Sequence, residues 1–192
     1  MLSDSNIILI NFYIGIKAKM TETNDTAQEN DIQYHRMIAV NAQYVKDLSF
    51  ESPKAPMSLV GERPNPEINI SVDVGAKKLG EDLFEVSLKI TSNAENKKEE
   101  GKDDGGTLFI AEVTYAGLFT IKNMPENQLE PALLIYCPTL LFPFIRRILA
   151  DVTRDGGFPP LMLDPVDFAG LYSQKQQQVA NSSQQDEQKQ SV

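Results

Sequence analysis

Apolar and polar residues alternate along four stretches of the chain, which is the pattern of half-buried β-strands. These stretches are residues 38–51, 68–74, 84–91 and 107–117. In the first stretch, the residues that we expect to point into the core are Ile38, Val40, Ala42, Tyr44, Leu48 and Phe50. In the last stretch both faces carry apolar residues, which indicates that its outer face is also partly covered.

The segments between the expected strands are of three kinds. Four prolines interrupt residues 52–66, so we expect an irregular loop there. Gly75 and Gly80 bound a tight connection between the second and third strands. Residues 93–106 are mostly charged, Asn or Gly, and cannot bury a core, so they predict a solvated hairpin loop.

A long apolar segment at 132–154 follows the strands and repeats with helical spacing. It is apolar on more than one face, and such a helix must be buried on more than one side. One small sheet covers only one side, so we expect another subunit to cover the second. Proline lacks an N–H and crowds the preceding turn, so we expect a kink at Pro143. Gly156 and Gly157 end the helix.

A short last helix is predicted to begin at Asp164 as its N-cap, followed by Pro165. It would carry Phe168, Leu171 and Tyr172. From residue 173 the chain has eight Gln among its last twenty residues and almost nothing apolar. We expect this tail, 173–192, to be disordered beyond its first turn.

These elements predict an α+β fold. We expect a meander-like, four-stranded antiparallel sheet packed with one long helix and one or two short helices. The length favours a single domain, at about 33–172, with an extension at 1–32 and the tail at 173–192.

The apolar stretch at 7–16 could be mistaken for the core of a signal peptide. A signal peptide has its positive charge before the apolar core and small residues at the cleavage site. Here Asp4 precedes the stretch, and Lys17 and Lys19 follow it, so the flanks do not fit a signal peptide. We expect Met20 to be the natural initiator and 1–19 to be an upstream extension. The alternative is an interfacial anchor. No other apolar run approaches the roughly 20 residues that span a bilayer, so we expect no stable membrane insertion.

The net charge of -9 argues against a nucleic-acid partner, because phosphate binding needs clustered Lys and Arg. A basic protein is the partner that fits this charge. The single cysteine excludes an internal disulfide, so nothing requires an oxidising compartment.

No group of residues predicts catalysis, a metal or a cofactor. His35 is the only histidine, and Cys137 is the only other soft ligand, about a hundred residues away. We interpret His35 as a strand-end residue and Cys137 as a buried structural thiol. Carboxylates are plentiful, but no particular pair is selected for acid–base chemistry.

Two groups of residues suggest binding surfaces instead. Asp47, Glu51 and Glu112 point outward from their strands, and they form an acidic patch if the first and fourth strands lie close. The alternative is an ordinary solvated sheet face. A second group surrounds three prolines and has two interpretations, a small core under a loop or an exposed groove for apolar chain segments. Its members are Phe158, Leu161, Leu163 and Phe168.

Three motifs occur in an order that closely resembles the SecB family of bacterial protein-export chaperones. They are the stretch from Tyr44 to Pro53, the stretch from Cys137 to Phe144, and the stretch from Gly157 to Phe168. The resemblance runs from about residue 33 to residue 172, which is the whole of the expected domain. The loop at 93–106 is longer than is usual in the family, residues 1–19 are foreign to it, and the Gln-rich tail has little to match.

The resemblance implies an ATP-independent cytoplasmic holdase that uses no cofactor and is not an enzyme. It implies a homotetramer, a dimer of dimers, that binds unfolded precursor chains in grooves beneath segments 52–66 and 156–168. The cargo would pass to the translocase motor SecA, whose zinc-bearing basic tail docks on Asp47, Glu51, Ile110 and Glu112. The subunit interface would include Ala111, Val113, Tyr115, Leu141, Ile145 and Ile148. The alternative is a non-export adaptor or an antitoxin-associated chaperone on the same scaffold.

Overall fold

The computed structural model describes residues 37–60, 66–96 and 106–189, and its side chains as far as residue 178. The expectations for Met20, for the stretch at 7–16, for His35 and for most of the 93–106 loop lie outside the described residues. The described residues all belong to one compact unit that spans Tyr34–Val192.

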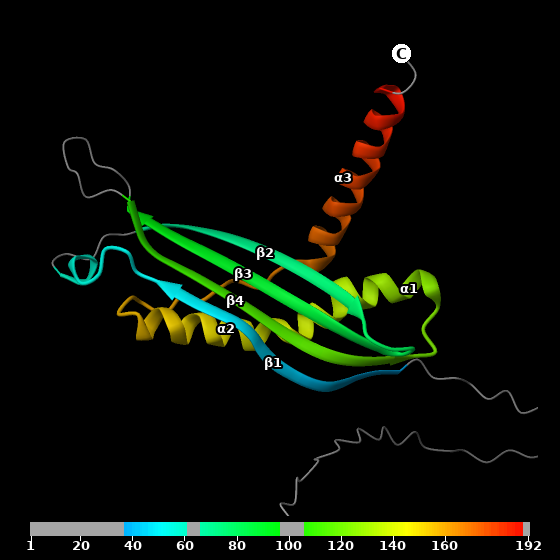
Figure 1. The fold of residues 1–192 in the computed structure, drawn as a ribbon, viewed down its shortest axis with the longest axis horizontal. Helices are drawn as coiled ribbons and strands as arrows, with labels where there is room; N and C mark the ends of the chain where they lie inside the picture. The colour runs from blue at the N-terminus through cyan, green and yellow to red at the C-terminus, as the bar shows by residue number, and fades with distance from the viewer. Residues whose placement is uncertain (1–36, 61–65, 97–105, 190–192) are drawn as a thin grey trace, which may run out of the picture. The chain divides into compact units, whose positions relative to one another are not determined.

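The four predicted strands are confirmed, and all but the first are considerably longer than the alternation indicated. They are β1 (Met37–Glu51), β2 (Glu67–Lys78), β3 (Leu83–Asn96) and β4 (Gly106–Lys122). All neighbours are antiparallel, and the order across the sheet is β1-β4-β3-β2 (Figure 1). Strands β2 to β4 form a meander, but β1 pairs with β4 at the other edge, so the prediction of a simple meander is wrong. Alternation predicts which face of the sheet a residue occupies, but it does not predict which strands are neighbours.

Two bulges in β1 reverse the direction of its side chains twice. The register against β4 shifts between Val40 and Ala42 and again between Val45 and Asp47. A bulge adds one unpaired residue and so exchanges the two faces. Ala42 and Tyr44 therefore lie on the outer face, and the prediction that they point into the core is wrong. Beyond the second bulge the original phase returns.

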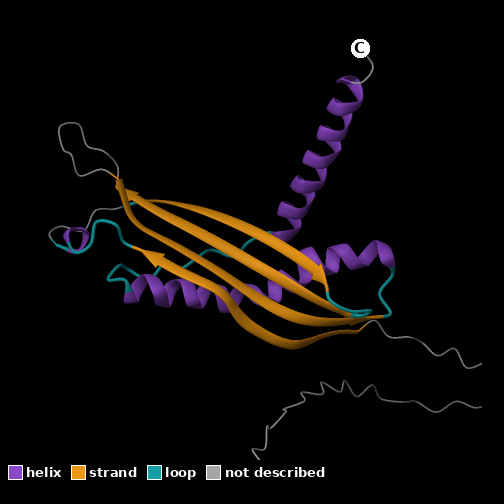
Figure 2. Cartoon of the chain, in the orientation of Figure 1, coloured by secondary structure: helices purple, strands orange, loops and turns teal. Residues whose placement is uncertain are grey.

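The long helix lies along one face of the sheet (Figures 1 and 2). It begins with α1 (Glu126–Pro131), passes through a π-helical turn, η2 (Ala132–Tyr136), and continues as α2 (Cys137–Asp155). Leu141, Ile145 and Leu149 follow one another at four-residue spacing and are fully buried against the sheet. The irregular turn directly precedes Pro138, whose missing N–H cannot complete the regular pattern of helix hydrogen bonds.

The helical segment Glu126–Asp155 contains an 18-residue window with a mean hydropathy of 1.6, which is apolar enough to cross a membrane. This corrects the expectation that no apolar run approaches that length. Half of the window is buried inside the fold, as in the core helix of a sheet-and-helix domain.

The six residues assigned to a subunit interface lie in the core of a single chain. Ala111, Val113, Tyr115, Leu141, Ile145 and Ile148 are all buried between the sheet and the helix. These six side chains serve the fold of a single chain, and their place in a subunit interface stays a prediction. Other apolar side chains on the same elements are exposed, among them Val40, Val45 and Leu48 on β1, and Tyr136 and Phe144 on the helix.

The last helix, α3 (Phe168–Lys189), begins later and ends later than the sequence pattern indicated. Its N-terminal cap is Asp167, whose Oδ1 accepts a hydrogen bond from the N–H of Gly170 at 3.0 Å, so the prediction of Asp164 as the cap is wrong. The backbone remains helical through the Gln-rich segment as far as Lys189, which corrects the expectation of disorder from residue 173. Gln, Lys and Glu favour helices even where no core supports them.

Candidate functional site

Three phenylalanine rings from separate parts of the chain pack together under a pocket, which Phe109 and Phe158 line and which Phe50 supports from behind. Phe50 is the next-to-last residue of β1, Phe109 lies near the start of β4, and Phe158 follows the long helix. The ring centroids of Phe109 and Phe158 are 4.9 Å apart, and those of Phe50 and Phe109 are 5.7 Å apart. These separations are in the range of favourable aromatic contacts, so the rings form a rigid apolar floor.

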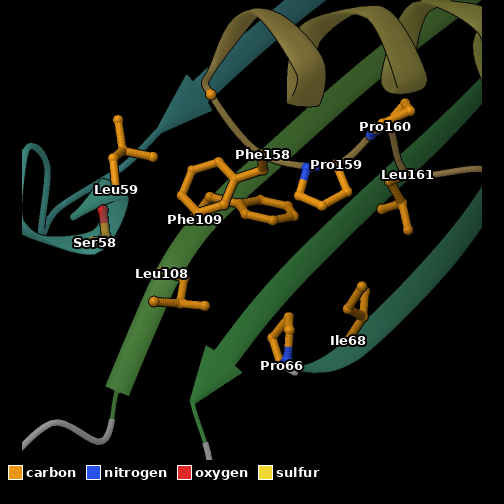
Figure 3. Close-up of a pocket in the computed structure, with 11 residues that line it drawn as sticks. Ser58, Leu59, Pro66, Ile68, Leu108, Phe109, Phe158, Pro159, Pro160 and Leu161 are labelled. Carbon is orange, nitrogen blue, oxygen red and sulfur yellow. The ribbon is translucent and has the colours of Figure 1, made fainter. Parts of the chain in front are cut away.

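The pocket above this floor has a volume of about 240 Å³ (Figure 3). Its walls come from the segment between β1 and β2, from the start of β2, and from the loop between α2 and α3. The lining residues are Ser58, Leu59, Pro66, Ile68, Leu108, Phe109, Gly157, Phe158, Pro159, Pro160 and Leu161. Such a lining binds apolar side chains through contact area, with few polar groups to impose a sequence.

The two interpretations of the Phe158–Phe168 segment each hold for one half of it. Phe158 and Leu161 are half-buried and line the pocket. Leu163 and Phe168 are each only 4% exposed and belong to the core, where Phe168 packs edge-on against Phe142. The first two are therefore available to a bound chain, and the last two support the fold.

The opposite wall comes from segment 52–66, which the family resemblance named as a whole without selecting any of its residues. Met57–Leu59 forms a short 3-10 helix, η1, and Leu59 lines the pocket. Met57 and Val60 are 73% and 70% exposed, which is unusual for large apolar side chains. The signal was present in the sequence, because Met57, Leu59 and Val60 form an apolar run inside a loop otherwise rich in prolines and polar residues.

Two glycines let the loop turn sharply at the end of α2. A Cβ on Gly156 would lie 2.2 Å from the Phe50 ring, so only glycine permits this close approach. Gly157 has a φ of +86°, in the left-handed region that favours glycine. The predicted helix stop at these glycines is confirmed, and it brings Phe158 onto the aromatic floor.

Thr153 fastens the loop to the end of α2. Its side chain is fully buried, and its Oγ1 accepts a hydrogen bond from the N–H of Leu161 at 2.9 Å. The same hydroxyl is within donating distance of the Leu149 carbonyl, also at 2.9 Å. The Thr153 carbonyl accepts a further bond from the N–H of Phe158 at 3.1 Å. One residue of the core helix thus holds two backbone positions of the pocket wall.

A second candidate surface lies on the opposite face of the sheet. Because β1 and β4 are neighbours, Asp47 lies opposite Thr114, Ser49 opposite Glu112, and Glu51 opposite Ile110. The condition for an acidic patch, that these strands lie close, is met. The patch consists of Asp47, Glu51 and Glu112 around Ile110, and we call it the acidic face.

The acidic face also contains a cation that sequence reasoning missed. The Nζ atom of Lys89, on β3, is 2.7 Å from Oε1 of Glu112, and Thr91 donates to the other carboxylate oxygen at 3.2 Å. The hydrogen bond from Lys89 holds the pKa of Glu112 below its ordinary value. Glu112 raises the pKa of Lys89, as do Asp47 and Asp73 more weakly. Lys89 was detectable as an outward-facing member of the third alternating stretch.

A separate polar cluster bridges β1 and β3 across β4. The Tyr44 hydroxyl donates to Glu85, and the Lys46 Nζ is 2.9 Å from the same carboxylate. The bond from Tyr44 is the main cause that lowers the pKa of Glu85. Tyr44 can reach over β4 because its partner there, Ala116, is small. This cluster explains why the bulged part of β1 turns Tyr44 outward.

Cys137 is fully buried at the start of α2, and burial raises its pKa to about 12. It is therefore protonated at neutral pH and acts as a packing residue. Among the described residues, no group of three or more His, Cys, Asp or Glu side chains is arranged to hold a metal ion.

The described residues thus form an apolar pocket between two proline-containing segments, on a sheet backed by one long helix. The sequence model of the family described as preprotein translocase subunit SecB matches residues 30–179. The chain belongs to the SecB family. Family and fold together define a chaperone for protein export.

Relatives in other bacteria agree with this assignment. The chain is 49% identical over 160 residues to the protein-export protein SecB of Parvibaculum lavamentivorans, covering 83% of this chain and 89% of that one. It is 52% identical over 153 residues to the protein of the same name from Maricaulis maris, covering 80% and 85%. Among solved structures, a SecB-like chaperone of Mycobacterium tuberculosis, in complex with an antitoxin peptide, is similar in fold. The TM-score is 0.52 at 15% identity, with 67% of this chain and 90% of that chain covered.

We predict that Thr153→Val loosens the pocket wall. The valine keeps the shape but removes the acceptor for Leu161 N–H, and an unpaired buried donor costs about 1–3 kcal/mol. Hydrogen exchange at the Leu161 amide should accelerate, and the free energy of unfolding should fall. Thr153→Ser keeps the hydroxyl and is the matched control. Exchange at Leu161 as slow in the valine variant as in the serine variant would contradict the role of this bond.

Proposed function

We propose that the protein is an ATP-independent holdase that binds unfolded precursor chains in the cytoplasm and passes them to the motor protein SecA. The observation that carries the proposal is the apolar pocket between η1 and the Phe158–Leu161 loop. Its floor of Phe109 and Phe158, supported by Phe50, fits an aromatic or branched side chain of an extended segment. A folded protein buries such side chains, so the pocket favours chains that have not yet folded.

Binding in such a pocket is promiscuous, because apolar contact has no direction. A single pocket of about 240 Å³ accommodates only one or two side chains, so each contact is weak. Tight holding then requires several pockets acting on one long chain, where the second contact benefits from the high effective concentration set by the first. Long unfolded chains should consequently bind far better than short peptides.

We predict that Phe158→Ser combined with Leu161→Ser weakens capture of an unfolded client at least about tenfold. Two half-buried apolar side chains are removed from the lining, and each contributes up to about 1.5–3 kcal/mol when fully buried. The measurement is the affinity for a fluorescently labelled, permanently unfolded protein. Leu79→Ser, an exposed leucine in the β2–β3 turn, is the matched control. Unchanged capture by a folded double variant would move the client site elsewhere.

We propose that SecA docks on the acidic face. The support is a group of carboxylates around the apolar Ile110 on the side of the sheet that α2 does not cover. A basic segment would be attracted to this face by charge and fixed by contact with Ile110, and the attraction would weaken with salt. Client and motor would then approach opposite sides of one sheet, so that SecA could bind while the pocket is occupied.

We predict that Glu112→Lys weakens SecA binding by about 1–2 kcal/mol at low salt, because it removes a carboxylate and places a second ammonium beside Lys89. Stability should change little, since the Lys89–Glu112 pair is partly exposed and such pairs contribute about 0–1 kcal/mol. Titration with SecA at two salt concentrations measures the effect. Glu81→Lys makes the same charge change in the β2–β3 turn, away from the face, and should bind as the unaltered protein does. Equal affinities for the two variants would remove the docking model.

We propose further that the protein is a homotetramer, a dimer of dimers. The support is the set of exposed apolar side chains on β1 and on the solvent side of the helix, including Leu48 and Phe144 at 46% and 42% exposure. Phe144 stacks on Tyr115 of its own chain at 5.8 Å, so its ring is held in place and ready for contact. Burying such side chains against another copy contributes about 1.5–3 kcal/mol each.

We predict a mass near four times the 21.4 kDa of one chain at micromolar concentration. Leu48→Asp combined with Phe144→Asp should reduce the mass, because each change puts a charge into the proposed contact. Light scattering with the unaltered protein and with Leu79→Asp as the control distinguishes assembly from loss of solubility. A stable, folded 21.4 kDa species in the unaltered protein would refute the assembly.

A further inference from the structure

We propose that Lys89 sets the selectivity of the acidic face, by occupying Glu112 until a stronger cation displaces it. Lys89 acts as an internal competitor for the carboxylate that a basic partner would use. The inference rests on the proposed docking of a basic partner on this face. It adds a residue whose removal should strengthen the binding of that partner.

The position of Lys89 follows from the register of the sheet. In one row across the four strands, Asp73 lies opposite Lys89, Lys89 opposite Thr114, and Thr114 opposite Asp47. The next row places Thr91 opposite Glu112. Lys89 is the one described cation that contacts Glu112. In its own row, Asp73 lies on one side of it, and Asp47 lies on the other side beyond Thr114. It stands within the acidic face, not at its border.

The two oxygens of Glu112 are both occupied in the unbound protein. Lys89 holds Oε1 at 2.7 Å, and the Thr91 hydroxyl donates to Oε2 at 3.2 Å. An arriving guanidinium that pairs with both oxygens of Glu112 comes close to the Lys89 ammonium at Oε1, and the repulsion between the two cations favours the release of Lys89. Guanidinium binds a carboxylate through two parallel hydrogen bonds, so it competes with a single ammonium better than another lysine does.

The exchange is possible because the pair is accessible. The Lys89 side chain is 43% exposed and that of Glu112 is 29% exposed. Exposed pairs contribute little to stability, so releasing Lys89 into solvent is not costly to the fold. The released ammonium remains near Asp47 and Asp73, which the elevated pKa of Lys89 already reflects. The competitor thus moves to neighbouring carboxylates, and weakly basic surfaces that cannot displace it are rejected.

The test is a titration of the full-length protein with SecA at low and high salt. Lys89→Gln frees Glu112 and should bind SecA about threefold or more tightly than the unaltered protein at low salt, with a steeper loss of affinity as salt rises. Lys89→Arg retains the competitor and should bind no more tightly than the unaltered protein. Lys122→Gln is the matched control. Lys122 is an exposed lysine on the same face of the sheet, at the end of β4 that is far from Glu112, and it pairs with Asp82 at 3.8 Å.

The outcomes separate the proposal from the docking model on which it rests. A gain with Lys89→Gln and none with Lys122→Gln supports the competitor. Equal gains in both variants would mean that only net charge matters, and a loss with Lys89→Gln would mean that Lys89 orients Glu112 for the partner. Either result overturns the proposal while leaving the docking face intact, provided that Glu51→Lys weakens binding in the same experiment. If Glu51→Lys and Glu112→Lys both bind normally, the docking face fails and the role of Lys89 fails with it.

Discussion

The contact between α2 and the central strands of the sheet is the interaction on which the other features depend. Leu141, Ile145 and Leu149 fill the space over β3 and β4, and the helix is thereby fixed along the sheet. Its C-terminal turn then determines where the Phe158 loop begins, through Thr153 and the two glycines. Its solvent side determines which apolar residues remain for self-association. Without this contact, neither the pocket nor the candidate interface would keep its structure.

The sheet separates two chemically different surfaces by the thickness of one layer. The helix side carries the aromatic floor and the apolar pocket, and the other side carries the acidic face. Neighbouring residues of β1 serve both, since Phe50 belongs to the floor and Glu51 to the acidic face. Period-two alternation makes this possible, because adjacent side chains of a strand point to opposite faces. An extended chain and a basic partner therefore need not compete for the same surface.

The sequence predicted elements better than it predicted their arrangement. Strong alternation was sufficient for all four strands, and Gly156 with Gly157 was sufficient for the end of the helix. The β1–β4 pairing was not predictable, because nothing in a strand's own pattern names its neighbour. Of the four residues predicted to bind a client, Phe158 and Leu161 line the pocket, while Leu163 and Phe168 are buried in the core, and their role in client binding stays a prediction. Lys89 was overlooked because its contact with Glu112, on the next strand, depends on the register between β3 and β4.

The paired bulges of β1 have a consequence for how this strand can vary. One bulge alone would exchange the faces for every residue beyond it, turning Phe50 to solvent and Glu51 into the aromatic floor. The second bulge restores the original phase, so the two faces are exchanged only in the segment around Tyr44, where the Tyr44 hydroxyl donates a hydrogen bond to Glu85. The strand therefore obeys a parity rule. Insertions or deletions between Val40 and Asp47 preserve both surfaces when they come in even numbers. A single inserted or deleted residue there would damage the aromatic floor and the acidic face at once.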